Sequence, residues 1–143
     1  MKSPAKIKAY FMEVDSKSKM PLKGYLGYLN NTLEAKQKFV GGIIQCVSLT
    51  SEIDIISNDE GKLLGLPANR VWIDIDNDGN IQVVDLFVGN LLAVRHEGEE
   101  FASIHDEDVE VIRRFLAPVI LTNNGLLHVP ESLLNEADVH DED

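Results

Sequence analysis

The chain has 143 residues, of which 44% are hydrophobic and 26% are charged, so it is long enough and apolar enough for one domain with a buried core. Its 24 acidic residues outnumber 13 Lys and Arg, and the formal net charge of −11 argues against nucleic acid as a direct ligand. A single cysteine, Cys46, excludes an internal disulfide and a thiolate metal cluster. No apolar run is long enough to span a membrane, and the first ten residues lack the apolar region of a secretory signal. We therefore expect a cytoplasmic protein without membrane contact.

The charge is unevenly distributed along the chain. Residues 1–38 carry eight lysines and three acids, a net charge of +5, whereas residues 39–143 carry five bases and 21 acids, a net charge of −16. The segments 97–110 and 131–143 hold seven and six acids and contain no Lys or Arg. Such an asymmetry indicates a molecule that docks through its electrostatic field, but a surface that only keeps the protein soluble is the favoured interpretation.

The first half of the chain predicts strands with one short helix. Apolar and polar residues alternate over 6–14, and residues 25–29 predict a second strand that completes a hairpin. Residues 30–32 offer N-caps for an amphipathic helix over 33–40, with Leu33 and Val40 on its apolar face, which two glycines end. The β-branched run 43–49 predicts a buried strand with Cys46 in the core. Residues 53–57 and 62–66 predict two strands around a turn.

The second half predicts two further hairpins and a second helix. Residues 70–75 alternate again and lead into a turn at 76–79, and the apolar run 81–94 contains Gly89-Asn90, which predicts a bulge or a bend between two strands. Asp106 is the expected N-cap of a helix over 106–116, and residues 119–129 predict a small hairpin. The expected fold is α+β, with a mostly antiparallel sheet of seven or eight strands and two helices. It forms one domain over 1–130, followed by a flexible acidic tail over 131–143.

The turn at 76–79 lies within a spacing that resembles a calcium loop. The carboxylates at positions one, three, five and twelve of that loop would be Asp74, Asp76, Asp78 and Asp85, with Gly79 at position six. Position twelve is usually Glu, however, and the flanking residues predict strands instead of helices. The favoured interpretation is a hairpin without metal, and calcium is the weak alternative.

Catalytic motifs are missing from the sequence. It contains no nucleophile elbow, no phosphate loop and no dinucleotide-binding glycine pattern. The four histidines show no metal-ligand spacing and are expected to be solvated on the surface: His96, His105, His128 and His140. We therefore predict no enzyme, no catalytic residue and no cofactor.

The segment 58–70 is the best candidate for a ligand site. A turn, Gly65 and Pro67 fix an unusual backbone path, and the planar donor fan of arginine suits a carboxylate or a phosphate. The candidate ligand-binding residues are Asn58, Lys62, Asn69 and Arg70. In the alternative interpretation this segment is a rigid corner in which the arginine pairs with one of the many acids.

Three blocks of the sequence carry a resemblance to a known family. They are TLEAKQKFVGGIIQCV from Thr32, the run NDEGKLLGLPANR with the following DNDGNIQVVDLFVGN, and FASIHDEDVEVI from Phe101. In this order they resemble the family called domain of unknown function 3846, over about 32–116. The resemblance implies a short protein of a bacterium, phage or conjugative plasmid, and it implies no activity or catalytic residue.

Two functions follow as hypotheses. The first is a non-enzymatic accessory protein of a phage or plasmid, which inhibits a basic nucleic-acid-binding or defence protein of the host through a face of carboxylates that imitates DNA. Its predicted acidic face consists of Glu97, Glu99, Glu100, Asp106, Glu107, Asp108 and Glu110. The second is a domain that binds a nucleotide or another small anion at the 58–70 corner. The sequence leaves the oligomeric state open.

Overall fold

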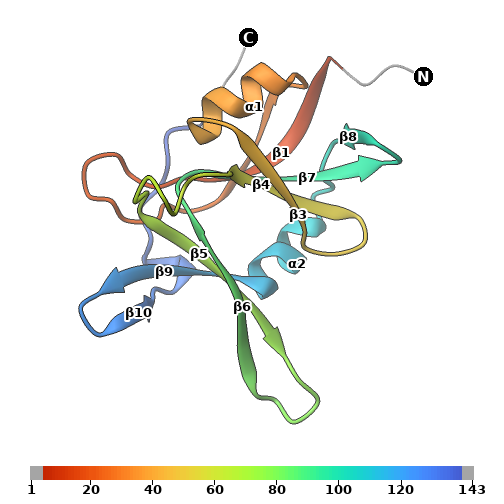
Figure 1. Ribbon diagram of the computed structural model, residues 1–143. Coiled ribbons are helices and arrows are strands. Elements are labelled where there is room, and N and C mark those ends of the chain that lie inside the picture. The colour runs from red at the N-terminus through yellow and green to blue at the C-terminus, as the bar shows by residue number, and fades with distance from the viewer. Residues whose placement is uncertain (1–4, 140–143) are drawn as a thin grey trace.

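Ten strands in two antiparallel sheets and two α-helices make up the described part of the chain, residues 5–139 of a computed structural model (Figure 1). The predicted α+β class with a mostly antiparallel sheet is confirmed. In chain order the elements are β1 (Lys6–Met12), β2 (Tyr25–Asn30), α1 (Leu33–Val40), β3 (Ile44–Ser48), β4 (Ile53–Asn58), β5 (Ala68–Ile75), β6 (Ile81–Val88), β7 (Leu91–Glu97), β8 (Glu100–Ala102), α2 (Asp108–Phe115), β9 (Leu116–Thr122), β10 (Gly125–His128) and a 3-10 turn η1 (Glu131–Leu133).

The larger sheet lies at the centre of the molecule and is buried on both faces. Its strands follow the order β2-β1-β7-β4-β3, with β8 paired to the end of β7. Because alternate residues of a strand point to opposite faces, β1 contributes Ile7, Ala9 and Phe11 to a cluster under α1, and Tyr10 and Met12 to a second cluster. The second cluster contains residues of α2 and of the smaller sheet, whose order is β10-β9-β5-β6. The fold is thus layered, with α1 on one side of the central sheet and the smaller sheet with α2 on the other.

The chain passes from one sheet to the other at Gly89-Asn90. β6 belongs to the smaller sheet and β7 to the larger one, so the apolar run 81–94 is two strands with a bend, one of the two predicted forms. Gly89 has φ +73°, a conformation that residues with a Cβ rarely adopt. The Asn90 side chain holds the bend by accepting a hydrogen bond from the Val14 backbone N–H (3.0 Å) and donating one to the Phe39 carbonyl.

The hairpins and the first helix form where local chemistry predicts them. β1 pairs with β2, β5 with β6 around the turn at 76–79, and β9 with β10. Thr32 caps α1, since its Oγ1 accepts a hydrogen bond from the Ala35 backbone N–H, and Gly41 ends the helix at φ +83°. The packed face of α1 differs from the prediction in part: Ala35, Lys36 and Val40 are buried, whereas Leu33 is exposed.

Three local predictions are wrong. β3 pairs only with β4 among the described strands and is an edge strand, so Cys46 is exposed and does not lie in the core. The predicted strand over 62–66 is absent: residues 59–65 form consecutive turns, and the Leu66 N–H donates a hydrogen bond to the Gly61 carbonyl (3.0 Å). The helix predicted over 106–116 spans only Asp108–Phe115, and the Asp106 carboxylate pairs with Lys8 instead of capping an N–H of α2.

The start of the predicted acidic tail packs on the domain. Leu134 is buried, the Asn135 carbonyl accepts a hydrogen bond from the Lys23 N–H (2.9 Å), and Glu131 contacts two arginines. Residues 140–143 lie outside the described part, so the predicted flexibility of the tail stays a prediction for them. Among residues 5–139, no helix has the length and apolarity that crossing a membrane requires.

We predict that Gly89→Ala destabilises the fold more than Gly79→Ala. Both glycines have positive φ, which costs an alanine about 1 kcal/mol. A Cβ on Gly89 would lie 2.8 Å from Leu66 Cδ1, whereas a Cβ on Gly79 would meet nothing within 4 Å. Urea unfolding should give a loss of about 1 kcal/mol for Gly79→Ala and of about 2–3 kcal/mol for Gly89→Ala. Equal losses would show that the bend tolerates the added methyl group.

Candidate interaction surface

The hairpin of β7 and β8 brings three of the predicted carboxylates together. Its register pairs Arg95 with Ala102 and places Glu97 directly opposite Glu100. The connecting turn contains Glu99 and Gly98, and Gly98 has φ +62°. Residues that face each other in an antiparallel pair have Cβ atoms about 5 Å apart, so two like charges there repel each other.

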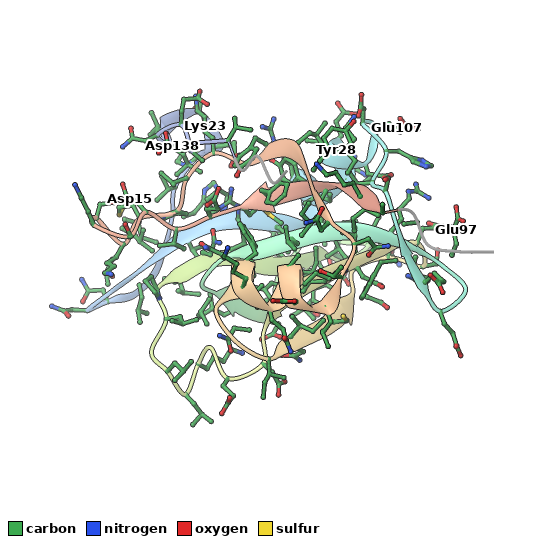
Figure 2. The ribbon with its side chains drawn as sticks, turned by 90° about the horizontal axis from the view of Figure 1, so that it is seen from above. Asp15, Lys23, Tyr28, Glu97, Glu107 and Asp138 are labelled. Carbon is green, nitrogen blue, oxygen red and sulfur yellow. The ribbon has the colours of Figure 1, made fainter. Side chains whose placement is uncertain are left out.

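The start of α2 adds three more exposed carboxylates. Glu107 has 81% of its side chain accessible, and the exposed Glu110 follows on the first turn of α2. Asp106 is also exposed and pairs with Lys8. Glu97 and Glu107 lie at the same end of the molecule, opposite the end that holds Lys23 and Asp138 (Figure 2). We call this surface the acidic end, and it consists of Glu97, Glu99, Glu100, Asp106, Glu107 and Glu110.

Asp108, the seventh residue of the predicted acidic face, is not available to a partner. It is buried and accepts two hydrogen bonds from the Arg95 guanidinium, at 2.7 and 2.8 Å, and one from the His105 backbone N–H at 2.9 Å. The hydrogen bonds from Arg95 are the main reason why the pKa of Asp108 lies below its usual range. Its role is to fix the start of α2 on β7. The sequence could not separate it from its acidic neighbours, because the pairing depends on the position of Arg95.

The structure separates the four residues proposed for ligand binding. Asn69 and Arg70 are both buried, and neither offers a polar group to a ligand at the surface. Asn69 donates hydrogen bonds to the carbonyls of Met12 (2.9 Å) and Gly89 (2.7 Å), and its Oδ1 accepts one from Arg70 (2.6 Å). Arg70 also donates to the Leu22 carbonyl (3.0 Å) and pairs with Glu131 at 3.4 Å, in agreement with the rigid-corner alternative. Burial lowers the pKa of Arg70.

Asn58 and Lys62 do line a common cleft of about 150 Å³. Its walls include Asp59 and Asp85, and Lys62 pairs with Asp85 at 2.7 Å. Asn58 is buried and uses its side chain within the chain, donating to the Val40 carbonyl (3.2 Å) and accepting from the Glu60 N–H (2.8 Å). Carboxylates in the wall repel an anion, so the cleft does not favour a nucleotide.

The calcium-like spacing folds as a β-hairpin with an acidic turn. The Asp76 carboxylate accepts hydrogen bonds from the backbone N–H groups of Asp78 (2.9 Å) and Asn80 (2.8 Å). These bonds close the turn and lower the pKa of Asp76. Asp74 accepts from the Ile75 N–H and Asp85 from the Leu86 N–H, while Asp85 also pairs with Lys62. Among the described residues, no group of three His, Cys, Asp or Glu side chains could hold a metal ion.

One histidine has a partner that the sequence did not predict. His96 on β7 lies with its Nδ1 3.0 Å from Asp54 Oδ2, and Ser48 Oγ donates to the other Asp54 oxygen at 3.3 Å. The three residues come from neighbouring strands, and only the register brings them together. The aspartate stands in the middle, so the order is not that of a catalytic triad, in which the histidine lies between serine and aspartate. His105 and His128 are exposed as expected, and His140 lies outside the described residues.

The comparisons with known proteins extend the suspected family over most of the chain. The family model described as Domain of unknown function (DUF3846) matches residues 8–117. The chain belongs to this family. The match starts within β1 and therefore includes the first hairpin, which lies outside the resemblance over 32–116. The matched region also contains the whole acidic end. Comparison with curated proteins and with solved structures found no similar protein.

We predict that Asn69→Ala lowers the free energy of unfolding by about 2–3 kcal/mol. The substitution leaves two buried carbonyls and the Arg70 guanidinium without their partner, and each unsatisfied group costs about 1 kcal/mol or more. Urea unfolding without any added ligand measures the change. Asn80→Ala, in the exposed turn of the β5–β6 hairpin, is the control and should cost far less. An unchanged stability of Asn69→Ala would argue against a structural role.

The contribution of the Asp108–Arg95 pair should vanish at low pH. Asp108→Asn should cost about 2 kcal/mol at pH 7, because Arg95 loses its charged partner. The folded pKa of Asp108 is depressed, so its stabilisation is complete above the unfolded pKa of about 4 and is lost as the pH falls through the folded pKa. Unfolding of wild type and variant between pH 7 and pH 2 should show a constant difference down to about pH 4 and a shrinking one below. A difference that does not depend on pH would exclude an electrostatic role.

Proposed function

We propose that the chain is a non-enzymatic protein-binding module of a mobile element, and that it recognises a basic protein through the acidic end. The observation that carries the proposal is the gathering of exposed carboxylates at the acidic end, where the β7–β8 hairpin and the start of α2 place Glu97 and Glu107 at the same end of the molecule. Clustered like charges repel one another, and a cationic partner would relieve the repulsion. The exposed carboxylates of Glu107 and Glu110 extend the same negative surface along α2.

The charges around the acidic end favour a protein as the partner. No Lys or Arg occurs from 96 to 112, so nothing in this stretch attracts a phosphate. The bases near the acidic end are already engaged: Lys8 pairs with Asp106, and Arg95 with Asp108. What remains is a surface of carboxylates, which complements a cluster of Lys and Arg on another protein.

The partner that fits this surface best is a protein that binds nucleic acid. Its binding groove carries clustered cations, because DNA presents one negative charge per about 1.7 Å of its axis. Exposed carboxylates on a hairpin and on the first turn of a helix can occupy such cations in place of phosphates. The module would then act as an inhibitor that competes with DNA.

The test is capture of partners from a bacterial lysate by three forms of the chain. The first is the wild type, and the second carries Glu97→Gln, Glu99→Gln, Glu107→Gln and Glu110→Gln, which leaves the Lys8 and Arg95 pairs intact. The control changes four exposed acids elsewhere: Glu34→Gln, Glu60→Gln, Glu136→Gln and Asp138→Asn. The control loses four negative charges, as many as the acidic-end variant. Wild type and control should capture the same basic protein. The acidic-end variant should lose it.

Salt and DNA provide the further readouts. The captured protein should dissociate as the salt concentration rises, since exposed charges are screened within about 8 Å at physiological ionic strength. Added chain should displace a DNA duplex from the purified partner. If the acidic-end variant and the control variant lose capture to the same degree, recognition at the acidic end is contradicted. If the chain binds the partner without displacing DNA, inhibition by competition is contradicted.

A further inference from the structure

The hairpin of β5 and β6 extends beyond the rest of the smaller sheet as an arm (Figure 1). We define the arm as residues 73–83. β9 pairs with β5 only at Arg70, Val71 and Trp72, so on that side the β5 residues of the arm are not covered by a neighbouring strand. β6 is the last strand of its sheet among the described residues, so its outer edge is also open.

One face of the arm is apolar and open to solvent. The register places Ile75 opposite Ile81 and Ile73 opposite Val83, so these four β-branched side chains share one face. The exposed fractions are 53% for Ile75 and 64% each for Ile81 and Val83. Single exposed apolar residues are ordinary on a protein surface, but a contiguous group of this kind marks a surface that binds something.

The arm itself carries a net negative charge. Asp74 lies on its opposite face, and Asp76 and Asp78 lie in its turn. The arm contains no Lys or Arg, and Arg114 of α2, which lies beside Ile73 and Ile75, offsets only part of this charge. A second copy of the chain would bring further carboxylates to this surface and would be repelled. The charge therefore selects an occupant that combines apolar with basic side chains.

The edge of β5 adds a place for a backbone to bind, where an incoming strand would compete with the Asp74 carboxylate that accepts a hydrogen bond from the Ile75 N–H (3.0 Å). A groove of about 350 Å³ lies along it, lined by Ile73, Asp74, Ile75, Arg114 and Phe115. Along this edge Ile73 and Ile75 point to one face of the arm and Asp74 points to the other. An extended segment bound there would therefore contact apolar and acidic side chains in turn. A complementary strand would place apolar residues beside the isoleucines and a cation beside the aspartate.

We propose that the arm binds an extended segment of a basic partner, in which apolar residues alternate with Lys or Arg. The proposal rests on the proposed function, because it assigns the segment to the same basic partner. α2 connects the two surfaces: its first turn belongs to the acidic end and its last residue, Phe115, lines the groove beside the arm. Eight helical residues span about 12 Å, so one partner can contact both surfaces.

Synthetic peptides of nine residues provide the probe. One peptide alternates Val with Lys, a second alternates Ser with Lys, and a third alternates Val with Glu. Fluorescence anisotropy with the full chain at physiological salt measures their binding. The Val–Lys peptide should bind about tenfold or more tightly than the Ser–Lys peptide, because only the former buries apolar side chains on the arm. The Val–Glu peptide should not bind.

Substitutions in the chain show where the apolar peptide binds. In the arm variant, Ile75→Thr, Ile81→Thr and Val83→Thr keep β-branched side chains, replacing the ethyl group of each isoleucine and one methyl group of the valine by a hydroxyl. The control variant carries Leu121→Thr and Leu126→Thr, an exposed apolar pair of β9 and β10. The preference for the Val–Lys peptide should disappear in the arm variant and persist in the control. Circular dichroism and thermal unfolding establish that both variants are folded.

The outcomes separate this inference from the proposed function. Equal binding of the Val–Lys and Ser–Lys peptides, or an arm variant that retains the preference, would overturn the role of the arm, whatever the acidic-end variant does in capture. If the arm variant loses the preference for the Val–Lys peptide, the role of the arm is supported, even when the acidic-end variant still captures its partner. In that case only the proposed recognition at the acidic end would fail.

Discussion

The fold depends on the buried pair of Asn69 and Arg70. The Asn69 amide donates to the Met12 carbonyl at the end of β1 and to the Gly89 carbonyl at the bend, so it joins the two sheets where the chain passes between them. Arg70 continues from Asn69 Oδ1 to the Leu22 carbonyl and to Glu131, so it also holds the loop before β2 and the segment after β10. A buried guanidinium is tolerated only when its donors are engaged, and Arg70 meets that requirement with partners from three segments far apart in sequence.

The fold class and most elements could be predicted from local patterns. The hairpin of β1 and β2, the caps of α1 and the turn at 76–79 each follow from residues a few positions apart. The errors arose where a residue's environment is set by the sheet order. Cys46 lies in an apolar run, as a central strand would, but β3 has a neighbour on one side only. The sequence contains no signal for this order, because it depends on long-range pairing.

The candidate sites show the same limit. Arg70 is a candidate ligand donor in the sequence because few cations occur in the acidic part of the chain. In the structure, most of these few cations bind carboxylates of the chain itself. Among the five bases after residue 38, Arg70 and Arg95 hold carboxylates within the fold, at Glu131 and Asp108, and Lys62 pairs with Asp85. Asp108 is thereby removed from the predicted acidic face, whereas its neighbour Glu107 stays exposed. Sequence composition predicted the sign of the surface, but only tertiary contacts could decide which charges remain on it.

The excess of acids in the sequence explains why the exposed surface is so one-sided. Each pair within the fold removes one base together with one acid, so the acids that outnumber the bases remain on the exterior. Glu97, Glu99 and Glu107 gather at the acidic end, where the repulsion between like charges costs stability in the free molecule. The arm has a similar cost, since Ile75, Ile81 and Val83 lie in water beside carboxylates. The acidic end and the arm lie at the two ends of α2, and each is unfavourable in the free molecule. A partner that supplies both cations and apolar side chains would make both surfaces favourable. We therefore regard α2, which Asp108 and Arg95 fix in place, as the element that sets the distance between them.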